Sequence, residues 1–162
     1  MMALEIKEKF EVVDSETDIE RLITDAPKEV AETIAQKSVI ILPSHESADS
    51  FYHGTLETLD YLNDHGLSTD VYSNDDEYKE LSLHGADIWL GTFFIKNFVI
   101  PVFCSVIAAY IYEKLRAKKD DKISLKFIVE KKDGNTTTVS YDGEVDNLDK
   151  AIDSVKSLSD ED

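Results

Sequence analysis

The sequence predicts an α/β fold that becomes α+β toward its C-terminus. Three stretches indicate this. Residues 38–73 follow the strand, helix, strand order of a βαβ unit, and residues 88–112 are almost wholly apolar. Residues 123–158 have the pattern of a β-hairpin followed by a helix. A chain of 162 residues can bury a sizeable core, so we expect one compact domain.

This domain should contain three parts in chain order. Residues 1–85 form an acidic α/β part, and residues 86–119 form an apolar helical spine. Residues 120–158 form a ββα unit, and 159–162 are a frayed tail. The first part should begin with a strand over 4–13, where apolar and polar residues roughly alternate.

Two short helices and the βαβ unit should follow. Ser15 and Asp18 are typical of a helix start, and Pro27 suits the first turn of a second helix, which we expect to end at Gln36. The run 38–43, SVIILP, predicts a buried strand.

A helix over 48–63 comes next. Phe51, Leu56, Leu59 and Leu62 lie near helical spacing in it, and His65-Gly66 should end it. A second strand over 67–73 completes the βαβ unit, so it should run parallel to the first.

The spine reads IWLGTFFIKNFVIPVFCSVIAAYIY from Ile88 to Tyr112, and Lys96 is its one charged residue. We expect a helix from about Asp87 to Lys118, interrupted near Pro101, with Lys96-Asn97 dividing it into two segments. A helix that is apolar on all sides must be buried on all sides. The spine is therefore core alone, core with an added partner or oligomer interface, or a membrane segment.

The membrane alternative meets an obstacle of length. The uncharged run 98–112 is shorter than the roughly 17 residues that a spanning helix needs. The N-terminus also has no basic region followed by an apolar stretch, so we expect a cytoplasmic protein, with membrane association as the alternative. Cys104 is the only cysteine, and its apolar neighbours predict a buried thiol that serves packing.

The ββα unit rests on three signals. Apolar and polar residues alternate over 123–129, Asp133-Gly134 is a strong hairpin turn, and Val139 and Tyr141 suit the returning strand. Gly143 should end that strand. An apolar stripe then predicts a helix with Asp146 as its N-cap and Asp149 in its first turn. The stripe consists of Val145, Leu148, Ile152, Val155 and Leu158.

The charge distribution bears on partners. The net charge is −17, and residues 1–85 alone hold 20 acidic and 6 basic residues. Such a chain repels the phosphates of nucleic acids, so we expect no nucleic-acid partner. The expected partner is a protein or a second copy of the chain, and no cofactor is predicted.

Two loops are the candidate ligand sites because they follow the two strands of the βαβ unit. The carboxyl ends of parallel strands are where α/β folds bind ligands. The eight candidate residues are Ser44, His45, Glu46, Asp49, His53, Asp75, Asp76 and Glu77.

Their chemistry is limited. On one helix, His45, Asp49 and His53 would share a face and could hold a metal, but the helix should begin after His45, so no metal site is predicted. Carboxylates of the two loops could bind Mg²⁺ or act as acid and base. No nucleophile turn, phosphate-binding motif or zinc motif is present.

Aromatic residues of the spine are the candidates for an interface, since aromatic side chains are enriched there. They are Trp89, Phe93, Phe94, Phe98, Phe103, Tyr110 and Tyr112.

Residues 89–158 carry a resemblance to a known class. An apolar stretch, WLGTFFIKNFVIPV and AAYIYEKL, precedes KISLKFIVEKKDG and TTVSYDGEVDNLDKAIDSV. This order resembles small uncharacterised accessory proteins of bacterial conflict and anti-phage gene clusters. The resemblance covers less than half of the chain and implies an accessory or scaffolding role, with no catalytic residues.

Two functions follow as hypotheses. The first is a non-enzymatic accessory protein that assembles with itself or a protein partner through the spine, with a membrane-anchored form as its variant. The second is a small α/β enzyme or a nucleotide- or metal-binding sensor that uses the loops 44–49 and 73–77.

Overall fold

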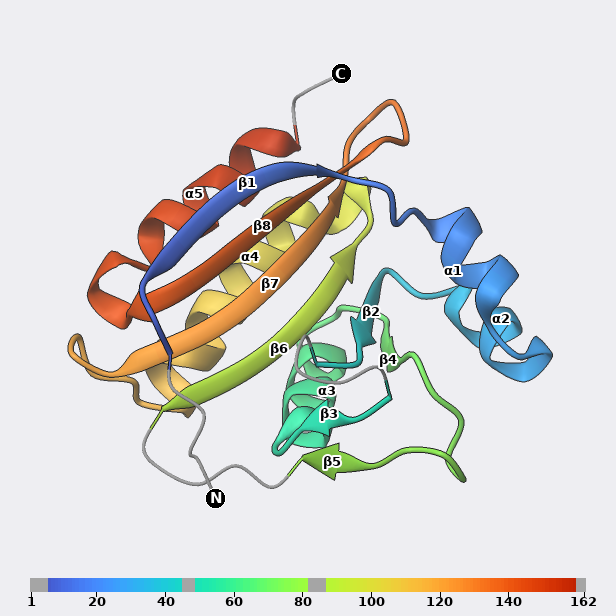
Figure 1. The fold of residues 1–162 in the computed structure, drawn as a ribbon, viewed down its shortest axis with the longest axis horizontal. Helices are drawn as coiled ribbons and strands as arrows, with labels where there is room; N and C mark the ends of the chain where they lie inside the picture. Colours follow the sequence, from blue (N-terminus) through green and yellow to red (C-terminus); the bar gives the residue numbers. More distant parts are fainter. Residues whose placement is uncertain (1–5, 45–48, 82–86, 160–162) are drawn as a thin grey trace.

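The computed structural model describes residues 6–44, 49–81 and 87–159 as one mixed α/β fold (Figure 1). Its strands are β1 (Lys9–Ser15), β2 (Val39–Leu42), β3 (Phe51–Tyr52), β4 (Thr69–Val71), β5 (Glu80–Leu81), β6 (Ile88–Ile95), β7 (Lys122–Glu130) and β8 (Thr136–Glu144). Its α-helices are α1 (Ile19–Asp25), α2 (Lys28–Ile34), α3 (Thr55–Asp64), α4 (Ile100–Ala109) and α5 (Asp149–Leu158). Shorter helical turns are η1 (Asn97–Val99), η2 (Tyr110–Lys114) and η3 (Val145–Asn147).

Six strands form the main sheet in the order β1-β8-β7-β6-β2-β4. β2 and β4 are parallel and joined through α3, which confirms the predicted βαβ unit. β7 and β8 form the predicted antiparallel hairpin, and Gly134 in its turn has φ +89°. β1 pairs antiparallel with β8 at one edge, although the two strands are far apart in sequence. The predicted mixed α/β fold class is therefore confirmed.

The prediction of a helix is wrong for the front half of the spine, because Ile88–Ile95 is the strand β6. It lies between β2, which runs antiparallel to it, and β7, which runs parallel. All six residues from Leu90 to Ile95 are buried. An apolar run buried on both faces has no alternation, so periodicity does not separate such a strand from a buried helix.

The division at Lys96-Asn97 marks the change from strand to helix. The Lys96 amide donates to the Ser38 carbonyl at 3.1 Å, and its ammonium donates to the Ala35 carbonyl at 3.2 Å. Asn97 then begins η1, and Pro101 lies in the first turn of α4. Proline is tolerated in a first turn, so the helix continues through Pro101 and is not interrupted there, contrary to our expectation.

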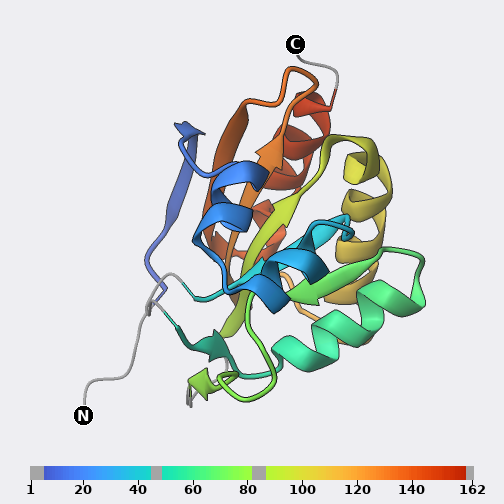
Figure 2. The same cartoon turned by 90° about the vertical axis from the view of Figure 1, so that its right-hand side faces the viewer.

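Helices cover the sheet unequally on its two faces. α3, α4 and α5 lie on one face, and α1 and α2 lie on the other (Figures 1 and 2). The larger core contains Phe93, Phe103 and Phe127, whose ring centroids lie 5.5 to 6.0 Å apart. The smaller core joins Leu22, Val30 and Ile34 of α1 and α2 to Ile40, Phe94 and Ile128 of the sheet.

Several predicted boundaries differ from the structure. Within the described residues the first strand spans Lys9–Ser15, and the helix expected over 48–63 begins only at Thr55. Asp18 caps α1 by accepting the Arg21 amide at 2.8 Å. β8 continues through Gly143 to Glu144.

At the C-terminal helix, Asp149 is in the first turn as expected. The N-cap is Leu148 rather than Asp146, because the 3₁₀ turn η3 takes up residues 145–147.

Candidate functional site

A cavity of about 710 Å³ lies beyond the carboxyl ends of β2 and β4. The corner formed by α1 and α2 walls one side, and the segment that follows β4 walls the other. Its lining consists of Thr17, Leu22, Pro27, Val30, Leu42, Pro43, Asp49, Tyr72, Ser73, Asn74, Asp76, Glu77 and Lys79. The volume is within the range of small-molecule sites.

The cavity has an apolar wall and an acidic rim. Leu22, Val30 and Leu42 belong to or pack on the smaller core, so the fold itself builds the apolar wall. The rim holds three carboxylates and one ammonium group, and the Lys79 Nζ lies 2.9 Å from Asp49 Oδ2. The remaining carboxylates, those of Asp76 and Glu77, favour a cationic ligand.

Hydrogen bonds fix the walls of this cavity relative to each other. The Tyr72 hydroxyl donates to the Leu22 carbonyl at 2.6 Å and so ties the end of β4 to α1. Burial, with a smaller contribution from Asp25, raises the pKa of Tyr72 above its ordinary value, so this phenol stays a donor at neutral pH. Asn74 Oδ1 accepts the Glu77 amide at 2.8 Å and shapes the turn after β4.

The structure brings some of the predicted loop residues together. Asp49, Asp76 and Glu77 line this cavity, as expected for loops after neighbouring parallel strands. Asp75 instead lines a smaller cavity of about 240 Å³ together with Glu29 and Asp70.

The other predicted loop residues lie elsewhere. Ser44 is buried, and its hydroxyl has no hydrogen-bond partner in the described part of the chain. His53 pairs with Glu80 at 3.3 Å, and His45 and Glu46 fall outside the described residues.

The helix face that would join Asp49 and His53 in a metal site is absent, and the third member, His45, lies outside the described residues. α3 begins at Thr55, so Asp49 and His53 both precede the helix. Across residues 6–44, 49–81 and 87–159, no three His, Cys, Asp or Glu side chains are grouped to hold a metal ion. Thr17, Pro27 and Tyr72 complete the cavity, but no local pattern in the sequence points to them, since α1 and α2 reach the cavity through the tertiary fold.

The predicted interface residues separate into core and surface. Phe93, Phe94, Phe103 and Tyr110 are buried, so they are core residues and not contact residues. Trp89 is half-buried, with its ring centroid 5.4 Å from that of Tyr52. Phe98 and Tyr112 are exposed, by 71% and 40%.

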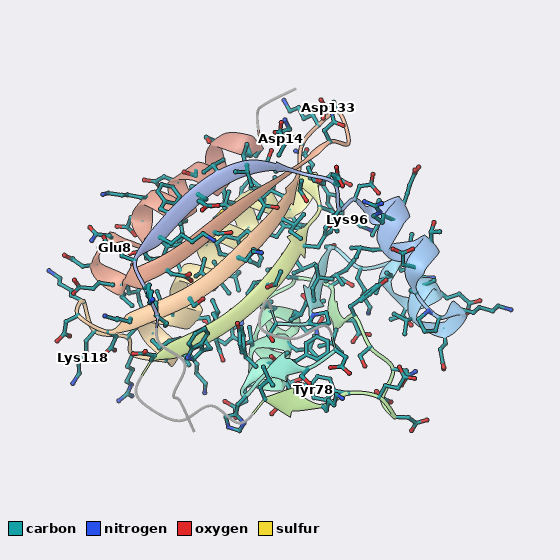
Figure 3. All side chains as sticks on the ribbon, viewed as in Figure 1. Glu8, Asp14, Tyr78, Lys96, Lys118 and Asp133 are labelled. Carbon is teal, nitrogen blue, oxygen red and sulfur yellow. The ribbon has the colours of Figure 1, made fainter. Side chains whose placement is uncertain are left out.

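These two exposed residues belong to a stripe on the helix Asn97–Lys114, formed by η1, α4 and η2. We call it the outer stripe, and it consists of the exposed or half-buried residues Phe98, Pro101, Val102, Ser105, Ala108, Ala109 and Tyr112. The spacing of three and four places them on one side of a helix. No charged residue occurs between Lys96 and Glu113. Figure 3 labels Lys96, which directly precedes this helix, and Lys118, which follows it in the chain.

The opposite side of this helix is fixed to the fold. Phe103, Cys104 and Ile107 pack in the larger core, and Tyr110 is hydrogen-bonded to Thr58 of α3 at 3.1 Å. Burial raises the pKa of the Cys104 thiol to about 11, which agrees with the packing role predicted for it.

By length and composition, one helix of the described part, Asn97–Lys114, could cross a membrane, and 33% of it is buried in the fold. A helix whose inner side belongs to a soluble core passes the same test, so this finding leaves the membrane alternative a prediction.

A surface hollow with a volume of about 430 Å³ lies beside Tyr112. This hollow lies where the end of η2 meets the start of α5, and Tyr112, Ala117, Lys119, Val145, Asp146 and Asp149 line it. The Tyr112 hydroxyl lies 3.4 Å from Asp149 Oδ1. Burial and Asp149 together raise the pKa of Tyr112, so its ring carries no charge near neutral pH.

Comparison of the chain with protein-family models, curated proteins and solved structures finds no match. The resemblance of residues 89–158 to accessory proteins of bacterial conflict gene clusters therefore stays a prediction.

Proposed function

We propose that this protein is a non-enzymatic interaction protein that assembles with a second copy of itself through the outer stripe. The observation that carries the proposal is the exposure of Phe98 and Val102, by 71% and 49%, on a helix side without charge. Contiguous exposed apolar surface on a folded protein is typical of an interaction site. Burying one such side chain contributes about 1.5–3 kcal/mol.

The lack of charge on the outer stripe, rather than the net charge of the chain, favours a second copy as the occupant. With a net charge of −17, two copies repel each other over most of their surface. The outer stripe is a region where they can approach without opposing charges. A basic partner would instead be attracted to the acidic residues of 1–85, which hold most of the negative charge. Homodimers are also the commonest soluble assemblies.

Val102 and Val13 provide a matched test of this proposal. They are exposed by 49% and 50%, but Val13 is on β1, on a different element from the outer stripe. We expect Val102→Glu to raise the dimer dissociation constant by about 100-fold, because it buries a charge in each half of the contact. Val13→Glu should leave the dissociation constant unchanged.

Sedimentation equilibrium over nanomolar to high micromolar concentrations measures both variants and the wild type. A strict monomer throughout the range would end the proposal. Flotation with neutral phosphatidylcholine vesicles tests the membrane-associated alternative. If the wild type bound the vesicles and Val102→Glu did not, that alternative would replace the proposed dimer.

The cavity of about 710 Å³ favours a second candidate function, the binding of a small amine with an apolar body. An apolar wall suits the body of such a ligand, and the carboxylates of Asp76 and Glu77 suit an ammonium group. This candidate corresponds to a sensor domain and uses no catalytic step.

Phenethylamine and 3-phenylpropionate are matched probes, since they share a phenyl ring and differ in the sign of charge. We expect saturable binding of the amine alone in calorimetry. Glu77→Gln should weaken it about fivefold, which is about 1 kcal/mol. Asp75→Asn is the control. It removes one negative charge as Glu77→Gln does, only two positions earlier in the chain, but Asp75 lines the other, smaller cavity. Equal binding of both probes, or equal effects of both variants, would count against an amine site.

A further inference from the structure

We infer that two copies pair antiparallel along their Asn97–Lys114 helices, about a twofold axis at Ser105, with each Phe98 seated in the other copy's hollow beside Tyr112. This inference rests on the proposed self-association. It adds the orientation and the contacts, which are tested separately from dimer formation.

The order of side-chain sizes along the outer stripe suits this pairing. In an antiparallel pair about Ser105, residues equally far from Ser105 face each other. Pro101 then faces Ala109 and Val102 faces Ala108, so each of these two larger side chains meets a small one. Small side chains let two helices approach closely, and larger ones fill the space that they leave. The stripe is therefore complementary to itself in the antiparallel orientation.

A parallel pairing lacks this complementarity. Each residue would then lie near its own equivalent, so Val102 would meet Val102 and the two alanines would meet alanines. Large side chains would collide at one end, and a gap would remain at Ala108 and Ala109. A twofold axis across the helices also closes the assembly at two copies.

Phe98 and the hollow beside Tyr112 supply the second argument. Phe98 is the most exposed large hydrophobic residue in the described part of the chain, at 71%. It lies 14 positions before Tyr112, so about 21 Å of helix separates it from the hollow of its own copy. The antiparallel pairing places Phe98 of one copy opposite Tyr112 of the other. The exposed Phe98 ring of each copy is then buried in the hollow of the other copy, so the dimer contains two such contacts.

The electrostatics of the contact agree with this arrangement. The stripe contributes no charge between Lys96 and Glu113, so closing it buries no ion. The hollow is lined by Lys119, Asp146 and Asp149 beside its apolar residues, so charged groups border the seated ring. The apolar contact therefore meets a polar border, as interfaces commonly do.

A cysteine on the twofold axis tests the orientation. In Ser105→Cys the two thiols of the dimer face each other, within the Cα separation of about 7 Å that a disulfide requires. Mild oxidation should convert this variant almost completely to a covalent dimer. Ser157→Cys is the control, since Ser157 is exposed on α5 outside the outer stripe. The wild type should stay uncross-linked, because its only cysteine, Cys104, is buried.

Phe98→Ala tests the seating of the ring. It should raise the dimer dissociation constant by about 100-fold, because two buried rings are lost in each dimer. Leu56→Ala is the control, because Leu56 is exposed by 45% on α3 and lies outside the stripe. It should change the dissociation constant less than about twofold.

The outcomes distinguish the two levels of the proposal. Monomeric wild type overturns the proposed function and this inference together. A wild-type dimer in which Ser105→Cys fails to cross-link, or in which Phe98→Ala has no effect, overturns this inference alone. Circular dichroism of each variant confirms that the fold is retained.

Discussion

The hydroxyl groups of Thr58 and Tyr110 are hydrogen-bonded at 3.1 Å inside the protein, and both side chains are buried. This bond joins α3 of the βαβ unit to η2 at the end of the long apolar helix. It thereby fixes the helix that carries the outer stripe to the N-terminal half of the domain.

Thr58→Val should destabilise the protein by about 1–3 kcal/mol, because it leaves the buried Tyr110 hydroxyl without this partner at nearly constant volume. Thr33→Val is the matched control. Both threonines also bond the carbonyl four residues earlier in the chain, but Thr33 is exposed. Urea unfolding measures both variants, and equal losses would mean that the bond to Tyr110 contributes nothing.

Cys104 should make stability fall at high pH. Burial raises its pKa from 9.0 to about 11 in the folded protein, so the unfolded thiol loses its proton first. The stabilisation from the protonated thiol is complete below about pH 9 and is lost as pH rises through about 11. The loss is on the order of 2 kcal/mol.

Urea unfolding between pH 8 and pH 11 tests this. The Cys104→Ala variant should be less stable below about pH 9, since it leaves a cavity in the core. Its stability should nevertheless fall less steeply than that of the wild type between about pH 9 and pH 11. Parallel curves for the two proteins would refute the assignment to Cys104. Tyrosines with raised pKa values contribute equally to both curves.

Salt should strengthen the self-association. Two chains of charge −17 repel each other, and salt screens that repulsion over about 10 Å at 0.1 M and about 3 Å at 1 M. The outer stripe offers no ion pair for salt to weaken. We therefore expect the dimer dissociation constant to fall several-fold from low to high salt, as measured by sedimentation. A rise would indicate a contact made by charged groups instead.

Asp18 should contribute to stability as the N-cap of α1. Its Oδ1 accepts the Arg21 amide at 2.8 Å, and Asp18→Ala should cost about 1 kcal/mol. Asp25→Ala is the comparison, because it removes an acid at the C-terminal end of the same helix, where a negative charge is unfavourable. Thermal unfolding should therefore show a loss for Asp18→Ala and no loss for Asp25→Ala.

Local signals in the sequence predicted the elements whose patterns are self-contained. Asp133-Gly134 between alternating runs specifies the hairpin β7–β8, and the apolar stripe from Leu148 to Leu158 specifies α5. β6 was missed because strands on both sides and cores on both faces surround it, and this removes its alternation. Its flanking partners, β2 and β7, are remote in sequence.

The candidate sites show the same limit. The loops after β2 and β4 meet at the cavity because parallel neighbours end at one edge, which chain order could predict for Asp49 and Glu77. No pattern in the sequence indicates that Tyr72 and the α1–α2 corner line the same cavity. Likewise, a helix apolar on all sides does not reveal its free side. Packing against α5, α3 and the sheet decides that Phe103 is core while Val102 is exposed.

The pairing of β1 with β8 affects how the protein is made. Ser15 and Thr136 are joined in the ladder and by a hydrogen bond from Thr136 Oγ1 to the Ser15 carbonyl, across 121 positions of sequence. On the ribosome, β1 therefore emerges long before its partner exists, and such distant pairings form slowly. Phe10, Val12 and Val13 have no partner strand during that interval, and an unpaired apolar strand is a site where chains aggregate.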